Sequence, residues 1–399
     1  VWGGRWISFN LDGRVRKGRW FHPERVRVES LRPGEAVKRV RDAVVGAVSS
    51  RTRGERVALS LSGGRDSGSV AVATQMAGVQ AECLTMKLDP DSEPPEVEAA
   101  RELAFAMGHS WQAASVHTMV SLDELRAIPD LAGSPIGFPM FPLAAAMRRA
   151  AGEVGATAIL DGEGGDILFT ASPVAILELA GAGRLASAWR AARAYRRRWI
   201  YSYPVVAKTV GRALAPRSLL AFRERLRPGP PWAVGSFHNE AAEPRTSRDV
   251  TLAFISSLGG SSYLELYEQL HQRGGVRYLT PFYDQRVVRA ALALPIEQRV
   301  PIPQAKPVLS SAFLSGFSAS RVKATQTAYF AALALCLHVD FPWLFESDSL
   351  CARRGFVRGS IGPLGADARW LVESLNVVPT EMWVRKMEEQ DETGLTAGV

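Results

Sequence analysis

The chain has 399 residues, of which 47% are hydrophobic, so it can bury a sizeable core and form more than one domain. Its most apolar stretch is interrupted by His338 and Asp340, and the lack of a run of about 18 apolar residues excludes a membrane-spanning helix. The net charge of +8 would suit nucleic acid, but the basic residues concentrate in 184–199 and 223–229 without an aromatic RNA-reading motif. We therefore expect solvated helix faces there, or a surface for an acidic or extended partner such as a peptide or RNA, and we expect no nucleic acid as the main partner.

The first 28 residues predict a β-hairpin, because an Asp-Gly pair separates two apolar-alternating runs in WISFNLDGRVRKGRW (6–20). The N-terminus lacks the basic and apolar regions of a signal peptide, so we expect a cytoplasmic protein with a missing upstream part. The cysteines show no disulfide or zinc-ligand spacing and are interpreted as free thiols: Cys83, Cys336 and Cys351.

Strands and helices are predicted to alternate between residues 35 and 161. A helical pattern at 35–49 leads into the first strand, and further helical patterns separate the strands expected at 56–62, 81–88, 109–116 and 156–161. This order predicts an α/β fold, a parallel sheet with helices on both faces that binds its ligand at the carboxyl ends of the strands. The predicted domains are a β remnant at 1–34, a nucleotide-binding core at 35–180 and a helical region that completes the active site at 181–399.

Glycine-rich acidic loops follow two of these strands. SGGRDS (62–67) follows the first strand, and DGEGGD (161–166) follows the fourth. Because both strands belong to one parallel sheet, both loops are expected at the same edge, where they can meet over one ligand.

The first loop has the composition of a phosphate cradle. Gly63 and Gly64 let the backbone turn and expose successive N–H groups, while Ser62 and Ser67 add hydroxyl donors. The following helix adds its positive end. Without further support, the same loop could be a tight turn with an N-cap serine.

The acids of the two loops predict a metal ion. A lone Asp66 beside a phosphate would repel it unless a cation lay between them, so Asp66 and Asp166 are interpreted as ligands of Mg²⁺ on a polyphosphate. The predicted ligand is ATP. The chain has no GxxxxGK[ST] motif, which argues against phosphoryl transfer of the Walker type and favours adenylation with release of pyrophosphate.

The motifs SGGRDS, DGEGGDILF, RYLTPFYDQRVVRAALALP, AKPVLSSAF and SRVKATQT occur in the same order as in the synthetase domain of the asparagine synthetase family, which the chain resembles over roughly residues 35–335. The resemblance implies an adenine nucleotide alpha-hydrolase-like, pyrophosphate-loop domain with Mg²⁺ at Asp66 and Asp166. It implies ATP contacts by the following residues: Ser60, Leu61, Ser62, Gly63, Gly64, Asp66, Ser67, Met86, Asp161 and Gly162.

The same resemblance implies three catalytic residues. Lys323 stands at the lysine that stabilises the transition states of adenylation and amide formation, and Lys306 matches a second lysine of less settled role. Glu163 stands where the family handles the proton of the attacking amine, although some relatives use another residue there. Without the resemblance, Lys323 would be a solvated side chain and Glu163 a helix cap.

The remaining motifs favour ring closure within one substrate. The chain begins at Val1 without the N-terminal cysteine of a glutaminase domain, and segments 320–333 and 345–357 resemble those of lasso-peptide cyclases, although the residues between Lys323 and Thr327 depart from the usual pattern. The resemblance then implies an ATP-dependent macrolactam synthetase in antibiotic biosynthesis. It would join an Asp or Glu side chain of a precursor peptide to the peptide's N-terminal amine, with a protease and a leader-peptide-binding protein as partners.

Other functions stay open at this point. They are β-lactam or asparagine formation on a small molecule, adenylation of a tRNA base, and a nucleotide-binding module without catalysis. The second loop and the lack of paired catalytic cysteines disfavour the tRNA reaction, and the retained Asp66, Asp166 and Lys323 disfavour the module.

Overall fold

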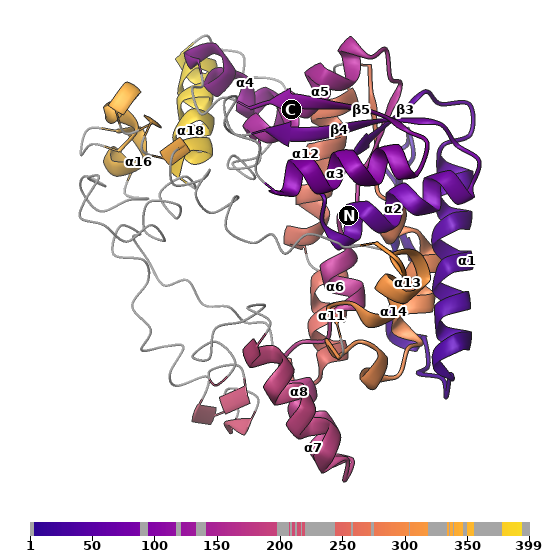
Figure 1. The fold of residues 1–399 in the computed structure, drawn as a ribbon. Helices are drawn as coiled ribbons and strands as arrows, with labels where there is room; N and C mark the ends of the chain where they lie inside the picture. The colour runs from indigo at the N-terminus through magenta and orange to yellow at the C-terminus, as the bar shows by residue number, and fades with distance from the viewer. Residues whose placement is uncertain are drawn as a thin grey trace.

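The fold is that of a computed structural model (Figure 1). It describes residues 4–87, 95–116, 121–132, 141–197, 244–256, 258–272, 275–302, 304–317, 339–345, 349–354 and 377–392, together with a few single residues and short pieces between 207 and 219 and between 333 and 337.

A five-stranded parallel sheet forms the centre of the molecule, in the strand order β5-β4-β3-β6-β7. The strands are β3 (Val57–Ser60), β4 (Ala81–Lys87), β5 (Ser110–Ser115), β6 (Ala158–Leu160) and β7 (Arg277–Leu279). The predicted α/β class and its four strands are confirmed. Strand β7 was not predicted, because its three residues are too few to show a strand pattern before Pro281.

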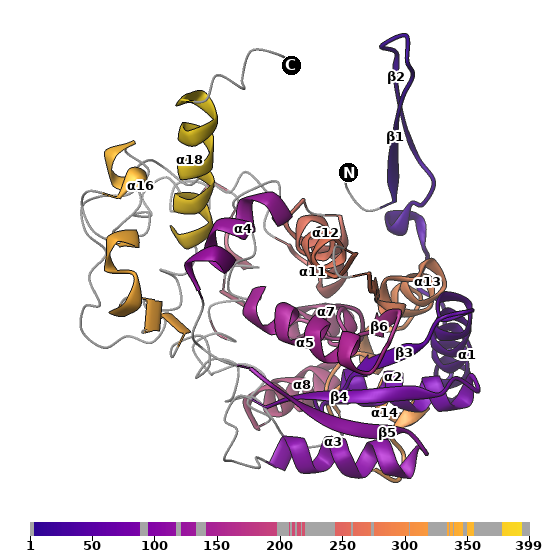
Figure 2. The same cartoon turned by 90° about the horizontal axis from the view of Figure 1, so that it is seen from above.

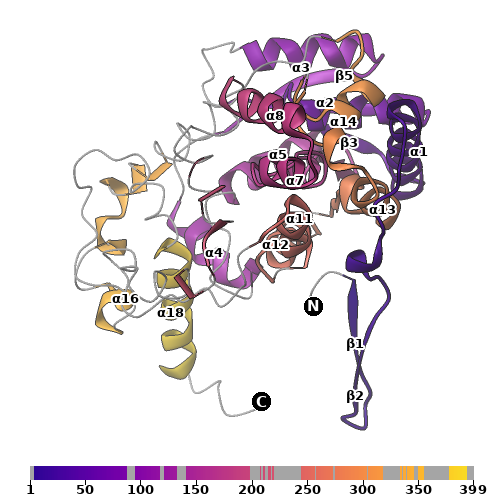
Figure 3. The ribbon, with the colours of Figure 1, turned by 90° about the horizontal axis from the view of Figure 1, so that it is seen from below.

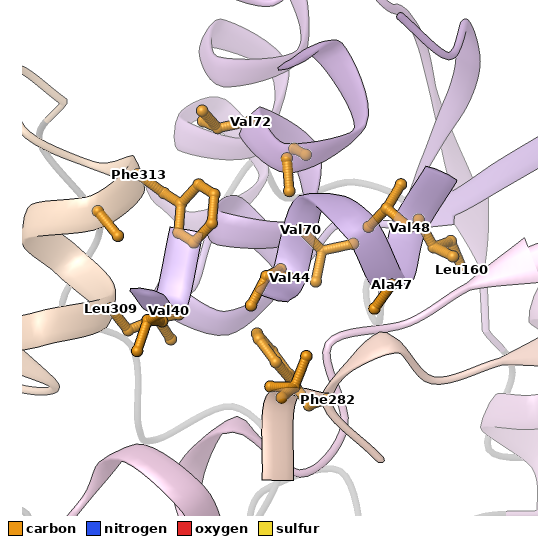
Figure 4. Close-up of a cluster of buried hydrophobic side chains, with 14 of the residues drawn as sticks. Val40, Val44, Ala47, Val48, Val70, Val72, Leu160, Phe282, Leu309 and Phe313 are labelled. Carbon is orange, nitrogen blue, oxygen red and sulfur yellow. The ribbon is translucent and has the colours of Figure 1, made fainter. Parts of the chain in front are cut away.

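Helices cover both faces of the sheet (Figures 1 and 2). One face carries α1 (Pro33–Arg51), α2 (Arg65–Met76), α3 (Pro95–Ala106), α13 (Gln285–Leu292) and α14 (Pro307–Phe313), and the other carries α5 (Phe141–Glu153) and α12 (Leu258–Gln272). The first layer buries Val44, Val70, Phe282 and Phe313 in one cluster (Figure 4). At about 1.5–3 kcal/mol for each such side chain, this cluster fixes α2 and α14 beside each other below the first loop.

The remaining elements lie around this core. They are α4 (Leu122–Ala132), α6 (Gly165–Phe169), α7 (Ala175–Gly181), α8 (Leu185–Arg197), α11 (Ser247–Ile255), α16 (Leu350–Arg353) and α18 (Val377–Glu392), with 3-10 turns at Pro23–Arg25, Pro281–Tyr283, Ile296–Gln298 and Pro342–Leu344. No helix among the described residues is both long and apolar enough to cross a membrane.

The predicted N-terminal hairpin is present. Strands β1 (Arg5–Phe9) and β2 (Val15–Arg19) pair antiparallel, and Gly13 takes a positive φ of 80° in the turn between them. The hairpin extends away from the sheet (Figures 2 and 3). Polar contacts attach the segment after the hairpin to the core, because Arg248 donates hydrogen bonds to the main-chain oxygens of Pro23 and Val26.

A second core cluster joins the C-terminal helices to α12. It includes Tyr267, Leu344 and Met382, and α16 and α18 lie on the opposite side of the molecule from α1 (Figures 1 and 2). Glu381 is fully buried here and accepts hydrogen bonds from the amides of Leu350 and Cys351 at 2.9 and 2.7 Å. None of the three cysteines forms a disulfide in the described part of the chain, in agreement with the predicted thiols.

Candidate active site

The two glycine-rich loops lie in direct contact at the carboxyl ends of β3 and β6. A Cβ atom placed on Gly162 would lie 2.7 Å from the amide nitrogen of Ser67. One on Gly165 would lie 2.3 Å from the carboxylate carbon of Asp66. These glycines are therefore required for the backbone of the second loop to approach the first this closely.

The first loop closes on itself through its serines. The Ser67 hydroxyl accepts a hydrogen bond from the Ser62 amide at 3.1 Å, and the two hydroxyl oxygens are 3.0 Å apart. Gly63 has a φ of 68° and packs so closely on the Glu96 carbonyl that a Cβ would lie 2.5 Å from it. Helix α2 begins directly after Gly64, so its positive end faces the loop, as an anion site requires.

Lys306 joins the acids of both loops. Its Nζ atom forms an ion pair with Asp66 and lies 2.8 Å from Oδ1 of Asp166, although Lys306 and Asp66 are separated by 240 residues in the sequence. The lysine side chain is 9% exposed. Lys306 also has a φ of 48°, the one positive value of a non-glycine residue in the described ranges. Such a conformation costs about 1 kcal/mol or more, and strain of this kind concentrates at functional sites.

The two aspartates fit the metal that the loops predict. Both carboxylates reach one cationic atom, the Lys306 Nζ, so their oxygens converge on a single point. Oδ1 of Asp66 is buried and has no hydrogen-bond partner among the described residues. Mg²⁺ is commonly held by one or two carboxylates together with the phosphates of a nucleotide, so these two aspartates are a suitable ligand set.

The acids of the site have raised pKa values. Burial raises the pKa of Asp66 to about 6, against the opposing effect of Lys306. Burial, with the nearby charges of Asp161, Asp66 and Asp166, raises the pKa of Glu163 to about 7. Burial alone would lower the pKa of Lys306, but the carboxylates of Asp66 and Asp166 outweigh it and raise that pKa. Glu163 is therefore a carboxyl group that can exchange a proton near neutral pH.

Asp161 acts as a hydrogen-bond acceptor within the protein. Its Oδ1 accepts the amide of Glu163 at 2.7 Å. Burial raises the pKa of Asp161, and hydrogen bonding by the Ser60 side chain, the Glu163 amide and the Tyr278 side chain opposes the rise. The carboxyl group thus links β3, β7 and the second loop.

The other predicted ATP contacts lie along the same edge. Leu61 is buried, its amide donates to the Leu84 carbonyl, and its carbonyl accepts from the Thr85 hydroxyl at 2.8 Å. Met86, near the end of β4, is half-buried and lies on the same face of the sheet as Ser60. Lys323 lies outside the described residues, so its predicted role stays a prediction.

Contacts that the sequence did not reveal hold Lys306 in place. The Arg65 guanidinium, at the variable position of SGGRDS, donates to the Ser310 hydroxyl at 3.1 Å, and that hydroxyl donates to the Ala305 carbonyl at 2.9 Å. The first loop and the turn before Lys306 are thereby joined. The serine of AKPVLSS was a visible signal, but nothing in the sequence paired it with Arg65.

A comparison with protein families agrees with this geometry. A family model described as asparagine synthase matches residues 39–316, which include both loops, β7 and Lys306. No curated protein matches the chain.

Proposed function

The chain belongs to the asparagine synthase family of ATP-dependent carbon–nitrogen ligases, and we propose that it closes a macrolactam ring in a precursor peptide. In this proposal an Asp or Glu side chain of the peptide is adenylated, and the peptide's N-terminal amine then attacks it. AMP and pyrophosphate are released. The proposal goes beyond the amide-forming activity of the family by naming the substrate and the source of the amine.

The observation that carries amide formation is the position of Glu163. It lies between Asp161 and Asp166 in the second loop, and burial raises its pKa to about 7. An attacking amine must lose a proton as the C–N bond forms, and a carboxylate with this pKa is a suitable acceptor near neutral pH. When the C–N bond forms, the C–O bond to AMP breaks, AMP leaves with the electron pair, and the proton of the amine passes to Glu163.

The remaining site residues serve the adenylation step. The first loop and the N-terminal end of α2 would hold the phosphates, and Lys306 would neutralise the negative charge of the departing pyrophosphate. Asp66 and Asp166 would hold Mg²⁺, which supplies Lewis acidity at the phosphates when bound. Lys323 would stabilise the transition states of adenylation and amide formation.

The choice of a peptide substrate is supported by sequence similarity. SRVKATQTAYFAAL (320–333) and FESDSLCARRGFV (345–357) resemble segments of lasso-peptide cyclases. A protease and a leader-peptide-binding protein are the partners that this substrate would need. The basic residues of α8 offer a cationic surface for the peptide.

Mass spectrometry of a reconstituted reaction tests the proposal. The purified protein is incubated with ATP, Mg²⁺, a candidate precursor peptide, the protease and the leader-binding protein, beside an Asp166→Ala variant. An Asp42→Asn variant serves as the matched control, because Asp42 is exposed on α1 and pairs with Lys38 at 2.7 Å.

The expected result is loss of one water from the cleaved peptide with formation of AMP, in the wild type and in Asp42→Asn but not in Asp166→Ala. Formation of AMP without loss of water from the peptide would contradict ring closure and direct the search to another nucleophile, such as the amine of a small molecule. No AMP with any carboxylate would contradict the proposed adenylation itself.

A further inference from the structure

Three side chains meet on one face of the sheet behind the second loop. Ala58, Ile159 and Tyr278 are neighbours across β3, β6 and β7. Because side chains alternate along a strand, Ser60 and Asp161, each two residues further along, point to that same face. The register of the sheet therefore explains why Ser60 and Tyr278 both reach the carboxyl group of Asp161.

The ring of Tyr278 is held by aromatic neighbours on α12. Its centroid lies 4.9 Å from that of His271, at an interplanar angle of 25°, and 5.1 Å from that of Tyr267. His271 is 1% exposed, and its Nδ1 lies 2.6 Å from the main-chain oxygen of Tyr267. This packing leaves the tyrosine ring little freedom, so the position of its hydroxyl is set by α12 and β7.

Asp161 transmits that position to Glu163. Its Oδ1 accepts the Glu163 amide at 2.7 Å, across the turn that carries the Glu163 side chain. Gly164, the next residue, has a φ of 95°, and a Cβ there would lie 2.7 Å from the ring of Tyr283. The main chain at Glu163 is thus fixed on one side by the Asp161 carboxylate and on the other by the close contact of Gly164 with the Tyr283 ring.

We propose that Tyr278 is a positioning residue for amide formation: with Ser60, its hydroxyl orients the Asp161 carboxylate, which fixes the main chain of Glu163 and aims the Glu163 carboxylate at the amine. This inference rests on the proposed function, in which Glu163 accepts the amine's proton. It also assigns Asp161 to the support of Glu163, because donors from three segments of the protein surround its carboxyl group.

Amide hydrogen exchange of the purified protein, with no substrate added, gives the first test. Tyr278→Phe removes the hydroxyl and keeps the ring, and we expect exchange of the amides at 161–165 to accelerate by about tenfold, the effect of one lost hydrogen bond. Ser60→Ala should accelerate the same amides.

Tyr195→Phe is the matched control. Tyr195, on α8, is also buried, and its hydroxyl donates to the carbonyl of Ala171, which lies between α6 and α7 rather than in the second loop, at 2.7 Å. The control should leave exchange at 161–165 unchanged. Equal acceleration in both variants, or no acceleration in Tyr278→Phe, would overturn the proposal.

The reconstituted reaction gives the second test, because it separates the two chemical steps. Tyr278→Phe should keep the KM for ATP and the rate of ATP–pyrophosphate exchange, which reports adenylation, and should lower amide formation and the release of AMP by about tenfold or more. In a Glu163→Gln background, Tyr278→Phe should have no further effect, because it acts through Glu163. A merely structural role would lower both steps and would persist in that background. If the wild type forms no amide, the proposed function fails, and the exchange comparison still decides whether Tyr278 orders the loop.

Discussion

The two edges of the central sheet both carry charged residues, but their charges are balanced differently. At the amino edge, an open groove of about 680 Å³ is lined by Arg53, Glu55, Arg56 and their neighbours. Hydrogen bonds from Thr157 and Arg277 lower the pKa of Glu55 there. At the carboxyl edge, burial raises the pKa values of Asp66, Asp161 and Glu163.

Unbalanced charge at the carboxyl edge, and not the open groove at the amino edge, therefore marks the site. Glu55 has both a hydroxyl and an arginine partner, which lower its pKa, so its negative charge is stabilised without a ligand. Asp66 and Asp166 share the single positive charge of Lys306. The three side chains together therefore keep a net negative charge when both acids are ionised, which favours a further cation. Substitutions at the two edges test this contrast.

Gly165→Ala should abolish activity at the carboxyl edge. Its Cβ would lie 2.3 Å from the Asp66 carboxylate carbon, so the loops must separate. Because displacement of reacting groups by about 1 Å can cost about 100-fold in rate, we expect at least that loss of ATP-dependent AMP formation. Steady-state assays with the peptide substrate measure it.

Gly152→Ala is the matched control for this change. Gly152 lies in α5, where a Cβ meets nothing within 4 Å. The control should keep activity and should stabilise the fold by about 0.5–1 kcal/mol, since alanine favours a helix over glycine. Full activity of Gly165→Ala would show that close contact of the loops is not needed.

The loops were predictable from the sequence, whereas the residues behind them were not. Each loop follows a strand of strong apolar pattern, and its glycines and acids lie within six residues of one another, so local information was sufficient to find SGGRDS and DGEGGD. Tyr278 reaches Asp161 from a three-residue strand, across more than a hundred residues of chain. No local pattern records such a pair.

Lys306 shows the same limit in another form. The resemblance to a family identified the residue, but neither its left-handed backbone nor its contact with both aspartates follows from AKPVLSS. Both depend on packing of α14 against α1 and α2, which is a tertiary effect. The alternation of strands and helices, by contrast, follows from local periodicity and was predicted correctly.

Glu163→Gln should alter the pH dependence of stability. The folded pKa of Glu163, about 7, lies above its ordinary value of 4.5, so between these values the folded state binds more protons than the unfolded state. Stability therefore falls as the pH rises through this window, and the full cost is present above pH 7. A glutamine cannot ionise, so the variant should be more stable than the wild type at pH 8, on the order of 1–3 kcal/mol, and equal to it near pH 4.

Urea unfolding at several pH values measures this difference. Glu98→Gln is the control for the loss of a carboxyl group, because Glu98 is exposed on α3, and it should be as stable as the wild type at pH 8. A Glu163→Gln variant that loses stability at pH 8 would contradict the idea that the buried, ionised Glu163 carboxylate destabilises the fold.

Arg277→Gln should have the smallest effect, because it changes the balanced edge. Arg277 pairs with Glu55 at 2.5 Å, but its own side chain is 59% exposed, so the pair contributes about 1 kcal/mol or less and weakens as salt increases. The pKa of Glu55 is lowered in the fold by Thr157 and Arg277, so the stabilisation is present above pH 4.5 and is lost as the pH falls. Thermal unfolding of the variant at pH 7 and pH 3 should therefore differ from that of the wild type only at pH 7.

Arg277 is adjacent to Tyr278 in β7, yet it lies on the opposite face of the strand. Unchanged amide formation in this variant would show that the amino edge stabilises the sheet without taking part in the reaction, and a loss comparable to that of Tyr278→Phe would contradict the division between the two edges.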